Sequence, residues 1–458
     1  MNPKTSAFDY LRNSALDARD FFAAHVSPFR RNQFGGSVGG RSRRTKRFSS
    51  SITKGIRQFL EENKTATVPA CNVPGVCTIT ATNPAVATAI ANSLALFPKP
   101  TALVSATTGI APQYGNQTDH ENYMLARFDY TFSDKDSLFL RYFLDKASFL
   151  EPFGGAGIAG GGPLLGWNEL DGSFSHFATL EERHVFSPTV VNTARVSFSR
   201  TEKDSHQTTI DSVNGPIPIG TNPCGSTTTY CPQTPLQYWP NIPGNYDGLP
   251  EIQGGLTNLG GSAISVFNLV QNRYTVADDI LWTRGAHTFR FGASVSRTQS
   301  NTNNPLKGDA IWVFSSFAQF LSGAPAQSVE GVIPSSINYS NRDYRQVDFD
   351  PYVQDDWKVS QKLTVNLGAR WEFYTNPNVL HNALYEIPNI QTSTAFAPFN
   401  NVFATNPSWH DIDPRIGIAY DPFADHKTAI RAGFGIVPRS DRWIGLRDWY
   451  TEQPSMAG

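Results

Sequence analysis

The residues best suited to acid–base chemistry are three pairs of adjacent carboxylates, Glu181-Glu182, Asp278-Asp279 and Asp355-Asp356. Two carboxylates can divide the roles of acid and base, as they do in glycoside hydrolysis. Each pair, however, lies in a stretch where apolar and polar residues alternate, and this alternation indicates a β-strand. Neighbouring residues of a strand point to opposite faces of the sheet. We therefore interpret the acids as part of a polar sheet face and predict no catalytic pair.

Other signals for chemistry are weak. Gly155 to Gly160 fits G-x-G-x-x-G, but no strand-to-helix unit surrounds it, and more glycines follow, as in a flexible loop. No Ser-His-Asp arrangement can be argued from the residue order. Four histidines show no metal-ligand spacing: His176, His184, His287 and His410. We predict a protein that is not an enzyme, with no cofactor and no metal site.

The four cysteines form two close pairs, Cys71 with Cys77 and Cys224 with Cys231, in loop-like sequence rich in Pro, Gly, Asn and Thr. Close pairing in loops suggests local disulfides and an oxidising exterior. Neither spacing is the C-x-x-C of a zinc or redox site. Free thiols are the alternative interpretation of both pairs.

Composition excludes some classes of protein. The formal charge of −1 over 458 residues argues against nucleic acid as a partner, although Arg41 to Arg47 is a basic cluster. Aromatic residues make up 12% of the chain and Gly and Pro are plentiful, which favours many strands joined by irregular loops. No apolar run approaches the roughly 18 residues of a membrane helix.

The positioning elements are long amphipathic hairpins, of which Tyr352 to Phe373 is the clearest. Its second half alternates strictly, with Leu363, Val365 and Leu367 on one face and polar residues on the other. This strand matches the roughly 9–11 residues of a transmembrane β-strand better than the 5–6 of a soluble sheet. Trp371 and Trp357 stand at its two rims, where membrane barrels carry aromatic girdles.

Four further hairpins repeat this design. They cover Met124 to Leu144, Ala178 to Phe198, Tyr274 to Val295 and Ile416 to Ile436. Helices are expected only around Tyr10 to Phe22 and Ala85 to Phe97. Long connections separate the hairpins: Thr201 to Asn272, Arg297 to Arg345, and Thr375 to Asp411.

Short turns at one end and long loops at the other are typical of an outer-membrane barrel. We therefore predict an all-β fold, an incomplete antiparallel transmembrane β-barrel with long extracellular loops in a Gram-negative outer membrane. One acid of each pair must then face lipid. The pairs at 278 and 355 lie just before short turns, where a lipid-facing charge costs only about 0–1 kcal/mol.

Several stretches together resemble the TonB-dependent outer-membrane transporters, specifically their Oar-like group. They are DARDFF, PFRRNQFGG, DKDSLFLRYF, YVQDDWKVSQKLTVNLGARWEF and DPRIGIAYDPF. The resemblance implies a barrel of twenty-two strands, a plug domain that gates it, and a TonB-type periplasmic protein that supplies energy. It assigns residues 1–33 to the end of the plug and the approach to the barrel, and residues 34–458 to a partial barrel. A secretory signal, the coupling motif and the last strands are expected outside this sequence.

Residues 41–55 depart from this resemblance, which leads us to expect Phe-Phe-Phe-Asn-Tyr-Glu-Gly where the chain has Ser49 to Gly55. Written as TTC TTC TTC AAT TAC GAA GGG and read one base later, the expected peptide becomes Ser-Ser-Ser-Ile-Thr-Lys-Gly. We hypothesise a local frameshift that scrambles the first hairpin. The encoding DNA decides it, because the other frame must contain the Phe-Phe-Phe strand.

The combined interpretation is a fragment of an energy-coupled importer of a scarce solute, with outer-membrane lipid and a TonB-type protein as partners. A secreted all-β adhesin and a passive porin are the alternatives. Some polar residues of the strands are expected to line the lumen, where they contact solute or plug, or pair with one another. They are Arg127, Asp129, Arg141, Arg195, Arg370, Glu372 and Arg431. The identity of the solute is not predicted.

Overall fold

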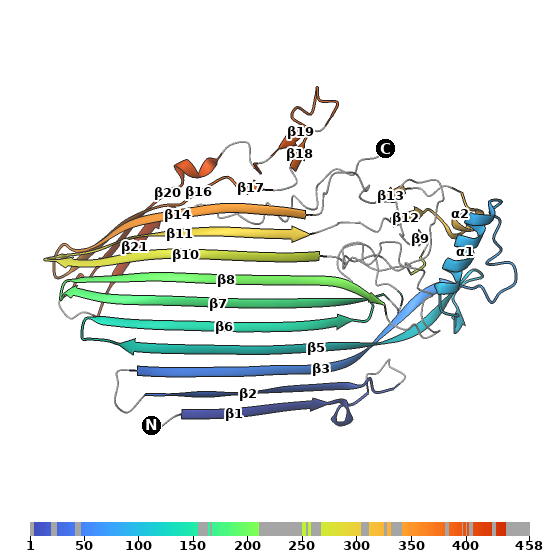
Figure 1. Cartoon of the computed structure of the whole chain (residues 1–458), viewed down its shortest axis with the longest axis horizontal. Coiled ribbons are helices and arrows are strands. Elements are labelled where there is room, and N and C mark those ends of the chain that lie inside the picture. Colours follow the sequence, from blue (N-terminus) through green and yellow to red (C-terminus); the bar gives the residue numbers. More distant parts are fainter. Residues whose placement is uncertain are drawn as a thin grey trace.

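The computed structural model is dominated by one large antiparallel sheet (Figure 1). The structure describes residues 4–19, 25–41, 47–153, 164, 167–209, 250–252, 255–257, 267–303, 311–324, 328–330, 341–380, 384–395, 397–399, 401–402, 406–423 and 427–436. Within them, no helix is long and apolar enough to cross a membrane.

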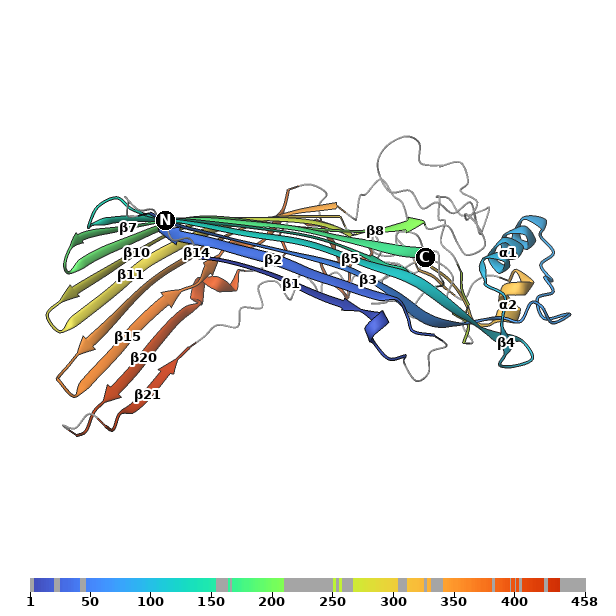
Figure 2. The ribbon, with the colours of Figure 1, turned by 90° about the horizontal axis from the view of Figure 1, so that it is seen from below.

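The main sheet follows the order of the chain, and each strand along its path pairs antiparallel with the next. Its principal strands are β1 (Lys4–Asn13), β2 (Phe29–Arg41), β3 (Arg47–Pro69), β5 (Thr108–Thr131), β6 (Asp136–Glu151), β7 (Trp167–Ser187), β8 (Val190–Thr209), β10 (Phe267–Arg284), β11 (His287–Asn303), β14 (Asn341–Lys358), β15 (Leu363–Trp371), β20 (Ile412–Tyr420) and β21 (Ile430–Gly435). Short strands extend it: β4 (Ala102–Leu103), β16 (Phe373–Tyr374) and β17 (Asn378–Val379). The strands curve round from β1 to β21, which are the two edges (Figure 2).

All five predicted hairpins are confirmed as β5–β6, β7–β8, β10–β11, β14–β15 and β20–β21. Their short turns gather at one end of the sheet, on the left of Figure 1, and the strand ends that lead into the long connections lie at the other. The strands run further into those connections than predicted, because β8 continues to Thr209 and β10 begins at Phe267. Ladder pairing stabilises these polar strand ends although their side-chain alternation is weak.

The helix predicted around Tyr10 to Phe22 is wrong for the described part of that stretch. Residues 4–13 form strand β1, which pairs with β2 from Lys4 opposite Gly39 to Asn13 opposite Arg30. Only a single 3-10 turn, η1 (Ser14–Leu16), follows, and Asn13 caps it by accepting from the Ala15 amide at 2.9 Å. The boundary drawn between residues 33 and 34 falls inside β2. The assignment of residues 1–33 to a plug stays a prediction.

The stretch 47–55 has regular pairing within the sheet. Ser49 lies opposite Gly40 and Phe128, and Ser51 lies opposite Val38 and Ala126. The first hairpin is therefore paired rather than scrambled in its backbone. The frameshift hypothesis concerns the side chains that this strand carries, and it stays a prediction.

Beyond the long-loop end of the sheet, four connections build a small apolar cap around α1 (Pro84–Leu96) and α2 (Phe317–Ser322), at the right of Figure 1. The helix expected from Ala85 to Phe97 is thus confirmed as α1. The cap core unites β3, β5, both helices and single residues of two other connections: Ala66, Val68, Val86, Ile90, Phe97, Ala111, Leu164, Leu256, Phe314, Phe320 and Leu321. Gly323 ends α2 at φ +65°, and a Cβ there would meet Ala81 and Val86 at 2.8 Å.

Small elements complete the described chain. One three-stranded sheet joins β9 (Pro250–Ile252), β12 (Ile311–Phe314) and β13 (Ser328–Glu330), and β18 (Leu384–Glu386) pairs with β19 (Ala397–Phe399). The 3-10 helix η2 (Pro407–His410) precedes β20. Cys71 and Cys77 are joined by a disulfide next to the cap. Cys224, Cys231 and the glycine motif at 155–160 lie outside the described residues.

Candidate functional site

The main sheet has two chemically different faces. On one face, which we call the apolar face, Val276 lies opposite Val196 and Val295, and Leu367 lies opposite Ile416. All five of these side chains are exposed, Val276 to 58%. A continuous apolar surface of this kind indicates a contact with membrane or protein. The opposite face, which we call the charged face, carries most of the ionisable side chains of the strands.

On β5 to β8, the charged face consists of closely paired ions. Arg127 donates to both carboxylate oxygens of Asp129 at 2.8 and 2.6 Å, and its guanidinium lies 4.5 Å from the ring centre of Phe139. Glu181 accepts from Arg195 at 2.8 and 2.5 Å on the neighbouring strand. Charge-assisted bonds of this kind fix side-chain positions as well as supplying energy.

On β10 to β20, the carboxylates of the charged face are more buried. Asp348 is 4% exposed and meets Arg273 at 3.1 Å. Asp350 is 7% exposed and lies 3.7 Å from Arg370, which also meets Glu372 at 3.2 Å. Burial of charge is tolerated only where partners are present, so these arginines are required for the structure of the face.

A tyrosine also bridges the charged face. Tyr352 of β14 donates its hydroxyl to Asp279 of β10 at 2.6 Å, although β11 runs between the two strands. The bridge passes over Gly292, where a Cβ would come within 2.5 Å of Asp279 Oδ1 and 3.0 Å of the Tyr352 ring. Glycine at this position therefore allows the bond to cross.

The three acid pairs of the sequence are split between the faces, as strand geometry predicted. Glu181, Asp279 and Asp356 lie on the charged face. Glu181 pairs with Arg195 and Asp279 with Tyr352, and Asp356 lies 3.8 Å from Arg290. Their neighbours lie on the apolar face, toward the short turns.

Two of these apolar-face acids form a hydrogen bond with an amide or imidazole side chain. Asp278 accepts from Asn192 at 2.6 Å, and Asp355 meets His287 Nδ1 at 2.6 Å. The His287 ring also stacks against Trp357 with centres 5.4 Å apart. These hydrogen bonds offset part of the cost of placing a carboxylate on the apolar face.

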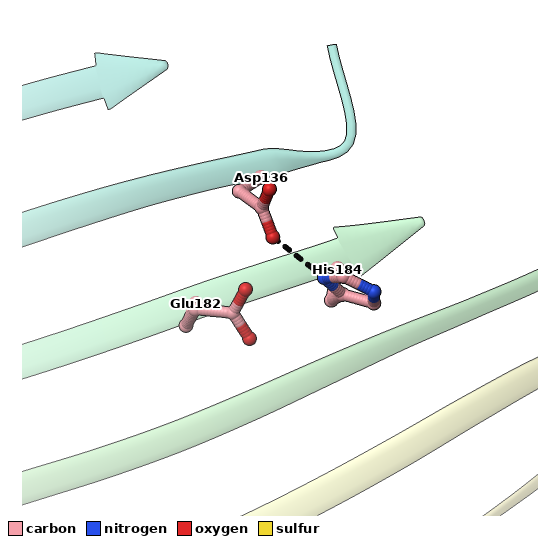
Figure 3. Close-up of side chains that lie close together, drawn as sticks. All are labelled: Asp136, Glu182 and His184. Atoms are coloured by element: carbon pink, nitrogen blue, oxygen red, sulfur yellow. Dashed lines mark hydrogen bonds and ion pairs between the residues drawn. The ribbon is translucent and has the colours of Figure 1, made fainter. Parts of the chain in front are cut away.

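The third apolar-face acid, Glu182, belongs to a cluster that sequence spacing did not reveal. Asp136 lies directly opposite His184 across β6 and β7, and its Oδ1 is 2.5 Å from His184 Nδ1 (Figure 3). One ligand atom each from Asp136, Glu182 and His184 lies within 4.8 Å of the others. Strand pairing brings together residues 48 apart in sequence, so only the register reveals the cluster.

The predicted lumen row lies on the charged face in its entirety. Arg141 is placed opposite Arg127 and Thr179 on this face, and Arg431 lies opposite Ala419 on edge strand β21. Arg127, Asp129, Arg195, Arg370 and Glu372 form ion pairs with partners in the sheet.

Aromatic side chains lie at both ends of the apolar face. Trp409 of η2 packs on Phe373 at 4.5 Å and on Trp371 at 6.2 Å between ring centres, and Trp371 Nε1 donates to the Ser408 carbonyl at 3.3 Å. At the short-turn end, Trp282 packs on Phe289 at 5.5 Å. Amphipathic rings at two levels suit the two interfaces of a bilayer.

The mouth of the charged face, at the long-loop end, holds an acidic network. Gln117 donates to Glu62 at 2.8 Å and to Glu151 at 3.2 Å, and Lys64 lies 3.6 and 3.7 Å from the same two carboxylates. Glu151 ends a strand of 16 residues, which exceeds the 9–11 needed to cross a bilayer, so it projects beyond the span. Burial and the neighbouring charge of Glu62 raise the pKa of Glu151.

This raised pKa predicts a pH dependence at the mouth. Because the folded state holds the Glu151 proton more tightly than the unfolded chain, local stability is expected to fall as pH rises above the ordinary value of 4.5. Hydrogen exchange at residues 147–151, corrected for intrinsic rates, should show faster opening at pH 7 than at pH 4.5. Glu151→Gln should remove this dependence and Glu62→Gln should reduce it. An unchanged dependence in Glu151→Gln would contradict the assignment.

Comparison with known proteins agrees with this architecture. A family model described as "Outer membrane beta barrel domain" matches residues 6–454. No curated protein matches the chain.

The solved structures to which the chain is similar include YddB, PiuA and Fiu. The outer membrane transporter YddB from Escherichia coli is 11% identical with a TM-score of 0.47, and the match covers 94% of this chain and 43% of that one. The siderophore receptor PiuA from Acinetobacter baumannii is 10% identical with a TM-score of 0.43, covering 94% and 48%. The ferric-catecholate import receptor Fiu from E. coli is 9% identical with a TM-score of 0.31, covering 94% and 66%. The chain thus spans less than half the length of the first two.

Proposed function

Because the chain belongs to the outer membrane beta barrel domain family, we propose that it forms part of the wall of an energy-coupled importer, with the charged face lining the passage for a scarce solute. The family places the chain in the outer membrane. The division of the strands into an apolar and a charged face carries the proposal, because a membrane barrel needs lipid outside and a polar lumen inside.

The paired ions of the charged face support passage of a polar solute. Arg127–Asp129, Arg195–Glu181 and Arg370–Asp350 keep the lumen hydrated without a large net charge. Such a surface attracts polar molecules weakly along its length, and weak repeated contacts allow a solute to leave as well as enter. No nucleophile with an adjacent base is required for this role.

The cap at the long-loop end supports capture from outside. Its core joins connections that are distant in sequence, and Thr67 of β3 donates its amide to Thr257 at 2.8 Å across 190 residues. Such a packed platform suits recognition of an external solute, because binding groups are usually carried on loops held by a scaffold. A TonB-type periplasmic protein would supply the energy through a plug domain.

Energy dependence of uptake separates the candidate functions. Cells that carry the longer protein containing this chain in the outer membrane would be given a panel of labelled iron chelates, oligosaccharides and peptides, with and without a protonophore. The proposal expects accumulation of one solute class that the protonophore abolishes. Uptake that is insensitive to the protonophore would identify a passive porin, and surface binding without uptake would identify an adhesin. Either outcome overturns energy-coupled import.

A further inference from the structure

We propose that Asp136, Glu182 and His184 form a binding site for one divalent transition-metal ion, with Zn²⁺ the best fit, on the apolar face at the short-turn ends of β6 and β7 (Figure 3). The site lies apart from the charged face and does not depend on what the barrel transports. It is a metal site at the short-turn end of the sheet, with three protein ligands.

The three side chains converge because of strand geometry. Asp136 and His184 are direct cross-strand partners, and Glu182 precedes His184 by two residues, which places it on the same face. The three ligand atoms already lie within 4.8 Å of one another. Zn²⁺ binds imidazole nitrogen and carboxylate oxygen at about 2.0–2.2 Å, so small side-chain rotations would bring the three ligand atoms to one ion, and water would take its fourth tetrahedral position.

The site is held in position by its neighbours. Ser133 donates its hydroxyl to Asp136 Oδ2 at 2.5 Å and accepts the Asp136 amide at 3.0 Å, which fixes this carboxylate in the turn. The Phe186 ring packs against the His184 ring with centres 4.3 Å apart. Partners that orient metal ligands in this way typically change metal affinity 10–100-fold.

Charge gives the second argument. Asp278 and Asp355 on the apolar face each have a polar partner, whereas no hydrogen bond or ion pair reaches Glu182 from within the described ranges of the chain. With a neutral His184, the cluster holds two negative charges on a lipid-facing surface. A divalent cation cancels both, and it also replaces the proton between Asp136 and His184.

The test uses the full chain folded into phosphatidylcholine vesicles and titrated with Zn²⁺ by calorimetry at pH 7.5. One equivalent is expected to bind, and His184→Gln or Glu182→Gln should each weaken binding at least tenfold. His287→Gln is the matched control, because the His287–Asp355 pair lies on the same face at the same end and belongs to no such cluster of three in the described chain. This control should bind Zn²⁺ like the original chain.

A second readout distinguishes loss of the metal site from misfolding of a variant. Co²⁺ bound by mixed nitrogen and oxygen ligands absorbs visible light, and this absorption should be lost in His184→Gln while the circular dichroism of the strands is kept. Absence of a stoichiometric Zn²⁺ site in the original chain overturns the proposal. Binding that is unchanged in both cluster variants, or equally weakened in His287→Gln, overturns it as well.

Discussion

Val295→Arg is expected to lower the free energy of unfolding of the membrane-inserted chain by about 2–4 kcal/mol, whereas Ser294→Arg should change it by less than about 1 kcal/mol. The two residues are neighbours on β11 and point to opposite faces. Val295 lies on the apolar face between Val276 and Phe349 and is 44% exposed. An arginine there would enter the hydrocarbon region, where it has no solvent.

The control substitution places the same side chain in a different environment. Ser294 donates to Asp350 at 3.3 Å on the charged face, so an arginine at 294 would meet a carboxylate. The two variants have the same length and net charge, and the added cation lies on opposite faces of one strand.

Urea titration of the chain in vesicles, followed by tryptophan fluorescence, would give the two free energies. Unboiled samples in detergent gels should also show a smaller folded fraction for Val295→Arg than for Ser294→Arg. A soluble adhesin predicts no such difference, since an exposed valine in water tolerates replacement by arginine. Equal stability of the two variants would therefore contradict the membrane-facing assignment.

The hairpins could be predicted from sequence because their signal is local. A period of two over residues 363–371 determines both the strand and its faces, and the same pattern gave the predicted lumen row. The helix predicted at residues 10–22 is wrong for the described residues 10–19, where Leu11 and Ala15 favour a helix only weakly. Ten ladder pairs between β1 and β2 outweigh that weak propensity.

The side-chain pairings could not be predicted, because they depend on register and on side-chain direction. To predict the Tyr352–Asp279 hydrogen bond, one would need to know that β11 lies between β10 and β14. One would also need to know that Gly292 of β11 leaves room for the bond to cross. The cluster of Asp136 with His184 depends on the pairing of β6 with β7. Predicting these contacts requires the exact pairing register of the strands, because a shift of one residue moves every side chain to the other face.

Introducing large side chains at residues 49, 51 and 53 is the second change with a large expected effect. These positions of β3 lie on the apolar face, where the chain has two serines and a threonine. The result is a groove lined by Ser49, Ser51 and, on the next two strands, Phe128 and Leu140. Ser49→Phe, Ser51→Phe and Thr53→Tyr together should raise the free energy of unfolding in vesicles by about 3–5 kcal/mol. On folding, each added ring would fill part of the groove and move its apolar surface from water into contact with lipid and neighbouring side chains.

The cross-strand partners show that this strand has room for such side chains. Ser49 lies opposite Gly40, Thr53 opposite Gly36, and Ser51 opposite Ala126. An aromatic ring already packs over a glycine further along the same strand. The Phe34 ring covers Gly55 so closely that a Cβ on residue 55 would lie 2.6 Å from the ring. Aromatic rings packed over glycines across a strand pair are a known way of stabilising sheets.

The frameshift hypothesis gains a physical test from this arrangement. The peptide Phe-Phe-Phe-Asn-Tyr over positions 49–53 would place aromatic rings at 49, 51 and 53 on the apolar face. Its asparagine would replace Ile52 on the charged face, where a polar side chain fits better. Ser50→Phe is the control, because residue 50 points to the charged face. This substitution should raise the free energy of unfolding very little. If the triple variant is no more stable than Ser50→Phe, or if the other frame of the encoding DNA lacks this peptide, the serines belong to the strand and the groove is a native feature of its lipid-facing surface.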